Sequence, residues 1–388
     1  MKKIMIIFCL IFLMVSCNNS QLKNKKILKF PLRKGKNWEE IFNLNSDIPN
    51  FHEFSYSWRE NSIYASIFDV SNIRHFYLKI NLNNKKFFLF GKPGQCPDCT
   101  LYVNSVSVLD NLVVVGMQNR GYNFYDFNGD FLFQFSNPDY PSGPCFIIED
   151  KFYALPCDTM DFKDKLLYVF DLKSMKLIGK YIDKKVFLSR IGYYDINNFG
   201  KNKGKNNISS VTKYITVFKY CIAGKENIAV LPCSLISAGG NKKIYFISLK
   251  NFSIKELSLK KYCNNLISHF HLKKFEVFSD VGSLGKNIFI ARRLIKGYDD
   301  KLIEKYGYLL LLEINVKGEL KSIYKFPKEL YPAMCSGVFP WCVRYVQNNE
   351  FLINMVFGLK NGSNYKAFLK TKGIKLTKKE ENWVLGKL

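Results

Sequence analysis

Short apolar runs separated by polar turns recur along the whole chain, with almost no sustained helical periodicity. The most regular unit occurs six times: one apolar run, a turn, and a second run rich in Tyr and Phe. The first run occupies residues 62–65, 111–115, 151–155, 227–231, 287–291 and 350–354, and the second occupies residues 75–80, 122–127, 167–172, 244–249, 308–314 and 365–370. Runs of this length are typical of β-strands, and a strand repeat of about 40–75 residues predicts the blades of a β-propeller.

One strand before and one after each pair of runs complete a four-stranded antiparallel blade. The prediction is an all-β fold, a single six-bladed β-propeller domain over residues 27–388. Helical periodicity is confined to residues 38–42 and 299–306, and the Gly, Lys and Asn run at 200–207 predicts a mobile loop. The predicted blades span approximately residues 51–90, 101–135, 144–182, 214–259, 269–326 and 341–378.

The ring must close, because an open propeller would leave two sheet edges exposed. Residues 26–32 have the pattern of a strand, and we expect them to pair with the sixth blade. The alternative is that residues 373–377 complete that blade alone.

The first seventeen residues have the pattern of an export signal. Lys2 and Lys3 precede an apolar stretch, residues 4–15, that is too short for a spanning helix. The run Leu13-Met-Val-Ser-Cys17 also resembles a bacterial lipobox, whose cysteine carries the lipid. The alternative is an ordinary cleaved signal with an incidental cysteine. With residues 18–26 as a polar tether, the pattern predicts lipidation at Cys17 and a lipid anchor in a membrane of the bacterial cell envelope.

The turn at Asn128-Gly129, within the phrase that begins at Tyr125, resembles the turn between the third and fourth strands of NHL and TolB-like six-bladed propellers. The turn at Lys317-Gly318 matches it as well. With the lipobox, the chain resembles the six-bladed propeller lipoproteins of Bacteroidetes over about 350 residues. The resemblance implies a fold and a location. It implies no reaction, because such propellers serve as enzymes, binding modules and scaffolds alike.

The formal net charge of +26 comes from fifty lysines and eight arginines against 32 acidic residues. The cations are scattered over turns and form no arginine-rich stripe, and the export signal also argues against a nucleic-acid partner. Lysine and asparagine are what an AT-rich genome supplies through codon drift. The other interpretation is attraction to an anionic partner, such as lipid headgroups or an acidic glycan.

Nine cysteines lie beyond the signal, and two pairs have the same spacing of twelve residues at equivalent places in blades three and four. In an oxidising compartment this spacing predicts disulfides, with Cys263 left single. The alternative is reduced cysteines packing as small apolar side chains. A zinc site would need a second Cys pair, and a thioredoxin-like site a βαβ frame, and neither pattern is present. The predicted disulfides are Cys145–Cys157, Cys221–Cys233, Cys96–Cys99 and Cys335–Cys342.

No nucleophile elbow or phosphate-binding loop occurs in the sequence, and there are only four histidines for acid–base work. His269 and His271 would share one face of a strand, but no carboxylate cluster lies near them in sequence. We therefore predict no catalytic residue, no metal site and no cofactor.

Loops that enter the first strand of a blade and leave the second lie at the same end of a propeller. Half of the eight arginines fall near this face, and converging arginines suit a carboxylate, sulfate or phosphate. The alternative is solvated loop charge and pairing between blades. The residues predicted for this ligand face are Arg120, Asp158, Arg292, Arg293, Trp341 and Arg344.

These patterns favour a membrane-anchored, exported, non-catalytic propeller that binds a protein or an anionic ligand, or acts as a scaffold. The alternative is a propeller hydrolase or lyase, lactonase-like or glycan-acting, with acids converging on the channel mouth. Carboxylates around a divalent ion would favour the enzyme, and an aromatic and basic rim would favour the binder.

Overall fold

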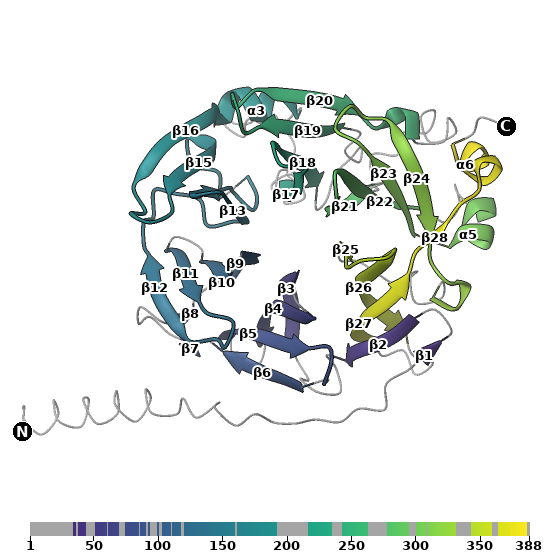
Figure 1. Cartoon of the computed structure of the whole chain (residues 1–388), viewed down its shortest axis with the longest axis horizontal. Coiled ribbons are helices and arrows are strands. Elements are labelled where there is room, and N and C mark those ends of the chain that lie inside the picture. Colours follow the sequence, from purple (N-terminus) through teal and green to yellow (C-terminus); the bar gives the residue numbers. More distant parts are fainter. Residues whose placement is uncertain are drawn as a thin grey trace, which may run out of the picture.

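Six antiparallel sheets stand around a central axis in the computed structural model of the chain (Figure 1). The predicted fold class, a six-bladed propeller with four-stranded antiparallel blades, is confirmed. Among the residues described, no helix is long and apolar enough to cross a membrane. The structure describes residues 34–35, 38–43, 51–59, 61–69, 74–84, 86–90, 92–93, 99–100, 103–109, 111–117, 120–159, 161–191, 216–234, 243–262, 278–294, 300–307, 309–330, 343–358 and 364–385.

In blades one to five the strands run in chain order from the axis to the rim, each antiparallel to the one before it (Figure 1). Blade one is β3 (Phe51–Arg59), β4 (Ser62–Asp69), β5 (Arg74–Asn81) and β6 (Lys86–Phe90), and blade two is β9 (Val103–Leu109), β10 (Leu112–Met117), β11 (Gly121–Tyr125) and β12 (Phe131–Phe135). Blade three is β13 (Cys145–Ile148), β14 (Lys151–Ala154), β15 (Lys165–Asp171) and β16 (Leu177–Asp183), and blade four is β17 (Thr216–Ala223), β18 (Asn227–Ser234), β19 (Lys243–Ser248) and β20 (Ile254–Ser258).

Blades five and six carry the additions that make the ring asymmetric. Blade five is β21 (Phe278–Leu284), β22 (Asn287–Arg293), β23 (Leu309–Ile314) and β24 (Leu320–Lys325), with β28 (Ile374–Lys375) on its outer edge, and blade six is β25 (Val343–Tyr345), β26 (Glu350–Gly358), β27 (Asn364–Lys372), β2 (Trp38–Asn43) and β1 (Lys34–Gly35). The remaining elements are the short parallel pair β7 (Lys92–Pro93) and β8 (Cys99–Thr100), the helices α3 (Lys184–Arg190), α5 (Asp300–Tyr306) and α6 (Lys378–Val384), and the 3-10 turns η4 (Lys260–Tyr262) and η5 (Lys328–Leu330).

The middle strands are mainly apolar because both faces of each blade are buried against neighbouring blades. On β10, Val113 and Val115 pack with blade one, whereas Val114, between them, packs with blade three. Successive side chains of a strand point to opposite faces, so a run of three valines supplies both interfaces at once. Aromatic rings fill the widening space toward the rim, as where Tyr77 of blade one lies 5.6 Å from Tyr125 of blade two between ring centroids.

The N-terminal part of the chain closes the ring, as expected, but through a different segment from the one predicted. Strand β2 pairs with β27, with Glu40 opposite Leu369, and becomes the fourth strand of blade six. Residues 38–42 were predicted to be helical, and this prediction is wrong, because an unpaired β27 edge offers a complete ladder of hydrogen bonds to an extended chain. The predicted closing segment, 26–32, lies outside the described residues.

The segment after β27 adds a fifth strand to blade five. It does not complete blade six, which was the alternative predicted for residues 373–377. Strand β28 pairs with β24, with Tyr324 opposite Lys375. Helix α6 then begins with a capping box between Thr377 and Glu380. Buried Glu381 accepts a hydrogen bond from the backbone N–H of Ile323 at 3.2 Å, which fixes α6 to the outer strand of blade five. Figure 1 shows α6 beside α5 outside this blade.

Most element boundaries agree with the sequence pattern. The turns at Gly129 and Gly318 have φ values of 87° and 82°. A residue with a side chain would be strained in this backbone conformation. The helix predicted at 299–306 is α5, whereas α3 and α6 were not predicted. The described first strands of blades five and six begin at Phe278 and Val343. Residues 200–207, His269, His271 and Trp341 lie outside the described residues.

The closing strand should contribute strongly to stability through Ile41. This side chain is 1% exposed and packs with Ile63 of blade one and Leu352 of blade six. We expect Ile41→Ala to lower the free energy of unfolding by about 2–5 kcal/mol, because it leaves a cavity at the seam of the ring. Ile374→Ala removes the same atoms from β28, where the side chain is 37% exposed, and should cost less than about 1 kcal/mol. Urea denaturation measures both, and equal losses would contradict the role of β2.

Candidate functional site

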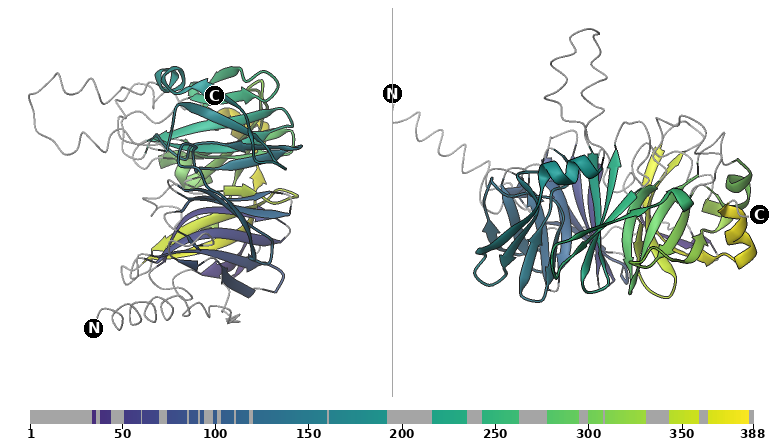
Figure 2. Two further views of the ribbon diagram at one scale, coloured as in Figure 1. Left: turned by 90° about the vertical axis from the view of Figure 1, so that its left-hand side faces the viewer. Right: turned by 90° about the horizontal axis from the view of Figure 1, so that it is seen from above.

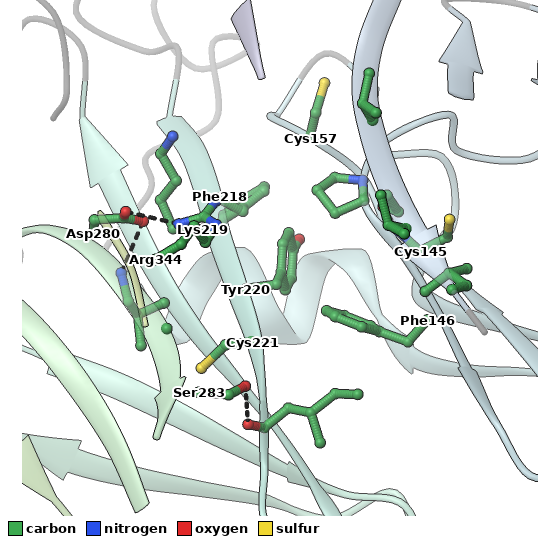
Figure 3. A pocket seen from close by; sticks show the side chains of 18 of the residues that line it. Cys145, Phe146, Cys157, Phe218, Lys219, Tyr220, Cys221, Asp280, Ser283 and Arg344 are labelled. Carbon is green, nitrogen blue, oxygen red and sulfur yellow. Dashed lines mark hydrogen bonds and ion pairs between the residues drawn. The ribbon is translucent and has the colours of Figure 1, made fainter. Parts of the chain in front are cut away.

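The first strands of the blades surround the axis, and a cavity of about 350 Å³ lies between them (Figure 3). Its described walls belong to β9, β13, β17, β21 and β25, and so to blades two to six, with Cys157 added from the loop after β14. A cavity of this size is at the lower end of the range for small-molecule sites. Figure 2 shows the ring from two sides, with the blades standing side by side around this axis.

Asp280 and Arg344 form an ion pair between blades five and six at the wall of this cavity. The Nη1 of Arg344 lies 2.9 Å from Oδ2 of Asp280, and the same oxygen accepts the backbone N–H of Val343 at 2.7 Å. The other oxygen, Oδ1, accepts the N–H of Val281 at 2.9 Å. The register of β21 shifts between Phe278 and Asp280. The three hydrogen-bond donors named above hold the Asp280 carboxylate, which thereby joins the first strands of two neighbouring blades.

The charge that the cavity offers to a ligand is positive. The side chain of Asp280 is 1% exposed, whereas that of Arg344 is 28% exposed. Lys219 of β17 is half-buried and lines the same cavity. On β17, Tyr220 packs toward blade three and Cys221 toward blade five, so the alternation places Lys219 on the side of blade five. Figure 3 shows Lys219 near Asp280 and Arg344.

The opposite wall of the cavity, formed by blades two and three, is mainly apolar. Val108 of β9, Pro144 and Phe146 are half-buried, so part of each side chain is accessible. Ser107 lies on this wall too, but its hydroxyl accepts the backbone N–H of Cys145 at 3.3 Å. In Figure 3, Phe146 points from β13 toward Tyr220 of β17. The cavity thus has a cationic side and an apolar side.

Three thiols line the cavity, and burial keeps all three protonated near neutral pH. Burial raises the pKa of the Cys145 thiol to about 12. Burial also raises the pKa of Cys221, and that of Cys157 is raised by burial and by the nearby Asp161 and Asp158 carboxylates. A thiol is a nucleophile or a metal ligand as its thiolate, so these cysteines are poor candidates for either role.

The two matched cysteine pairs hold free thiols in the structure. Cys221 is opposite Ala229, and Cys233 is opposite Val217, so Cys221 and Cys233 are four positions apart along the ladder. At about 3.3 Å per residue this is roughly 13 Å, far beyond the 7 Å between Cα atoms that a disulfide spans. The Cys221–Cys233 prediction is therefore wrong: equal spacing in sequence does not place the two residues opposite each other.

The Cys145–Cys157 prediction is not realised either, because the chain leaves the hairpin before Cys157. Cys145 is opposite Ala154 and packs between blades two and three. The carbonyl of Cys157 instead accepts the N–H of Phe218 in blade four at 2.8 Å. Figure 3 shows the two sulfurs apart. The predicted Cys96–Cys99 and Cys335–Cys342 pairs involve residues outside the described part of the chain.

Of the predicted ligand face, Arg344 lines the cavity, and Arg292 is turned away from it. Arg292 is completely buried, and its Nη1 donates to the carbonyl of Val384 at the end of α6, at 3.4 Å. Arg120 and Arg293 are half-buried and are not among the described residues that line the cavity. The predicted convergence of four arginines is thus replaced by Arg344 together with Lys219.

Asp158, also predicted for the ligand face, stabilises a loop instead. Its Oδ1 accepts the N–H of Asp161 at 2.9 Å, and Asp161 in turn accepts the N–H groups of Ser142 and Cys157 at 3.1 and 3.0 Å. Burial raises the pKa of Asp161 although these hydrogen bonds act to lower it. Among the described residues, no three His, Cys, Asp or Glu side chains are grouped as metal ligands.

Sequence reasoning missed Lys219 and Asp280, the two other charged residues of the cavity. Each lies in the first strand of a blade, Lys219 within the mainly apolar run 215–223 and Asp280 between Phe278 and Val281. A charged residue in such a run faces a neighbouring blade or the axis, so this interruption was the available signal. It could not reveal the partner, because Asp280 and Arg344 are in different blades.

No protein-family model matches this chain, and no curated protein matches it in sequence. Several solved structures are distantly similar to this chain. BamB from Moraxella catarrhalis is 9% identical, with 81% of this chain and 71% of that chain covered and a TM-score of 0.34. A protein of Bacteroides fragilis described as exported is 12% identical, with 85% and 97% covered and a TM-score of 0.35.

The propeller domain of the Trilobed protease from Pyrococcus furiosus is 10% identical, with 84% of this chain and 85% of that chain covered and a TM-score of 0.39. Likenesses of this size carry no argument about function. The assignment to six-bladed propellers rests on the six sheets of the chain itself.

We expect Arg344→Ala to lower the free energy of unfolding by about 3 kcal/mol, because it leaves the buried Asp280 carboxylate without its counter-charge. Arg190→Ala, at the exposed end of α3, should cost less than about 1 kcal/mol. Adding Asp280→Asn to Arg344→Ala should recover part of the loss, because an amide carries no charge. Denaturant titration of the four proteins gives the values, and a single Arg344→Ala variant as stable as the parent would refute the stabilising role of the Asp280–Arg344 ion pair.

Proposed function

We propose that this chain is an exported, lipid-anchored six-bladed propeller that binds a small anionic ligand in its central cavity. The observation that carries the proposal is the unequal exposure of the Asp280–Arg344 pair. The acid is buried and the base is accessible, and Lys219 adds a second cation on the same side. A carboxylate or a phosphate would meet two positive groups at the wall of a partly enclosed site.

The geometry favours an anion over a cation for a physical reason. Both oxygens of Asp280 already accept hydrogen bonds, and its side chain has almost no contact with solvent. An arginine carries five N–H donors in a fixed fork, so Arg344 has the donor capacity to bind Asp280 and a ligand together. In a cavity between sheets, water screens such contacts less than it does on the surface, which strengthens them.

The anion site predicts a selective effect of Lys219. We expect Lys219→Met to weaken the binding of inorganic phosphate or acetate by roughly tenfold or more, because a charge-assisted hydrogen bond contributes about 1.5–3 kcal/mol. Lys176→Met removes the same charge from an exposed turn and should change the affinity little. Isothermal calorimetry at two salt concentrations measures both variants.

If Lys176→Met and Lys219→Met weaken binding equally, and salt removes the difference from the parent, the attraction is diffuse and the proposed site is wrong. The double variant Asp280→Asn with Arg344→Met provides a second test, because it removes the accessible cation without leaving a buried charge behind. It should lose anion binding while remaining folded.

The membrane anchor is proposed from the lipobox at Leu13-Met-Val-Ser-Cys17. We expect Cys17→Ala to move the protein from the membrane fraction to the soluble fraction, because the lipid is attached at this sulfur. Fractionation of cells that express the whole chain measures the change, with Cys9→Ala, in the same apolar segment, as the matched control. Retention of the Cys17→Ala protein on membranes would contradict lipid anchoring.

A further inference from the structure

We propose that the ligand of the central cavity is an amphipathic carboxylate, with its anionic group at Arg344 and Lys219 and an apolar tail against blades two and three. This inference rests on the proposed anion site and adds the chemical class of the ligand. It is based on the separation of charged and apolar residues between the two walls of the cavity. The charged residues in the described part of the lining come from blades four to six, on strands β17, β21 and β25.

Among the described residues that line the cavity, those from blades two and three include no charged side chain. Val108, Pro144 and Phe146 present partly exposed apolar surface there. The one hydroxyl on the β9 part of this wall, that of Ser107, accepts the N–H of Cys145. A hydrated inorganic anion would leave this surface in contact with water, whereas an aliphatic or aromatic tail would cover it.

The size of the cavity sets the length of the tail. A volume of about 350 Å³ corresponds to roughly twelve water-sized groups, at about 30 Å³ for each. A carboxylate with a chain of up to about eight to ten carbon atoms fits this space. Longer chains would have to leave through the open end of the channel.

The distribution of charge also favours one orientation of the ligand in the cavity. Reversing the ligand would place its carboxylate against Val108 and Phe146 and would leave both cations facing an apolar tail, which costs desolvation without compensation. Phe146 points toward Tyr220 in Figure 3 and packs with the apolar cluster between blades three and four, so a tail that lies against β13 would meet a continuous apolar surface.

The test is a homologous series of linear carboxylates, from acetate to decanoate, titrated into the full-length protein by calorimetry. Each added methylene that becomes buried should tighten binding about fourfold, until the cavity is filled and the increase stops. Octanol at the same concentrations should bind more weakly than octanoate, because it has the tail without the charge.

Two variants assign the tail to its wall. Val108→Thr keeps the shape of the side chain and adds a hydroxyl, and Phe146→Ala removes the ring. Both should reduce the gain per methylene while leaving the affinity for acetate unchanged. Val186→Thr, on the exposed face of α3, is the matched control and should leave the whole series unchanged. Lys219→Met should weaken every member of the series by the same factor.

The outcomes separate the two proposals. Acetate and phosphate binding that depends on Lys219, with no gain from chain length, would overturn the amphipathic ligand and leave the anion site intact. Equal binding of octanol and octanoate would overturn the anionic end. If the parent protein binds neither a carboxylate nor phosphate, both proposals are refuted.

Discussion

Burial of both faces of every blade is the constraint on which this structure depends. A blade in an open arrangement would expose an apolar face, and in a closed ring each blade covers its two neighbours. The constraint explains why Val113 to Val115 can be continuously apolar and why the rim is filled with aromatic rings. It also explains why the last sheet takes its fourth strand from the N-terminal part of the chain, since without β2 the seam between blades six and one would stay uncovered.

The same constraint creates the cavity. The first strands of the blades surround the axis, and the described lining of the cavity between them comes from these strands, from Pro144 and from Cys157. What lines this space is decided by the first strand of each blade. Asp280 joins blades five and six through its ion pair with Arg344. The side chain of Arg344 is 28% exposed and therefore remains accessible from the cavity. If the cavity binds an anion as proposed, structural and binding roles meet in one pair of residues.

The fold could be predicted from local signals, such as the apolar runs and the glycine turns at Gly129 and Gly318, because each blade is built from neighbouring strands. The closing strand could not, because the partner that makes residues 38–43 extended is β27, at the other end of the sequence.

The site was harder to predict still. Arg292 and Arg293 are adjacent, but successive side chains of β22 point to opposite faces of the sheet. The Arg292 side chain is directed toward α6. The cysteine pairs failed for the same kind of reason, since register and not spacing decides which residues face each other. Among the described residues of the predicted face, Arg344 lines the cavity, because it lies on a first strand.

The closure through β2 has a consequence for the way the chain reaches its native state. Blades two, three and four consist of consecutive strands and can form in the order in which they are synthesised, whereas blade six must bring position 40 to position 369. A contact of such high sequence separation forms slowly, and it forms after the C-terminal strands exist. Until then the molecule is an open arc with an uncovered β27 edge and a free N-terminal strand. Two arcs that meet at this stage can exchange these strands, so the seam at blade six is the point at which domain swapping would begin.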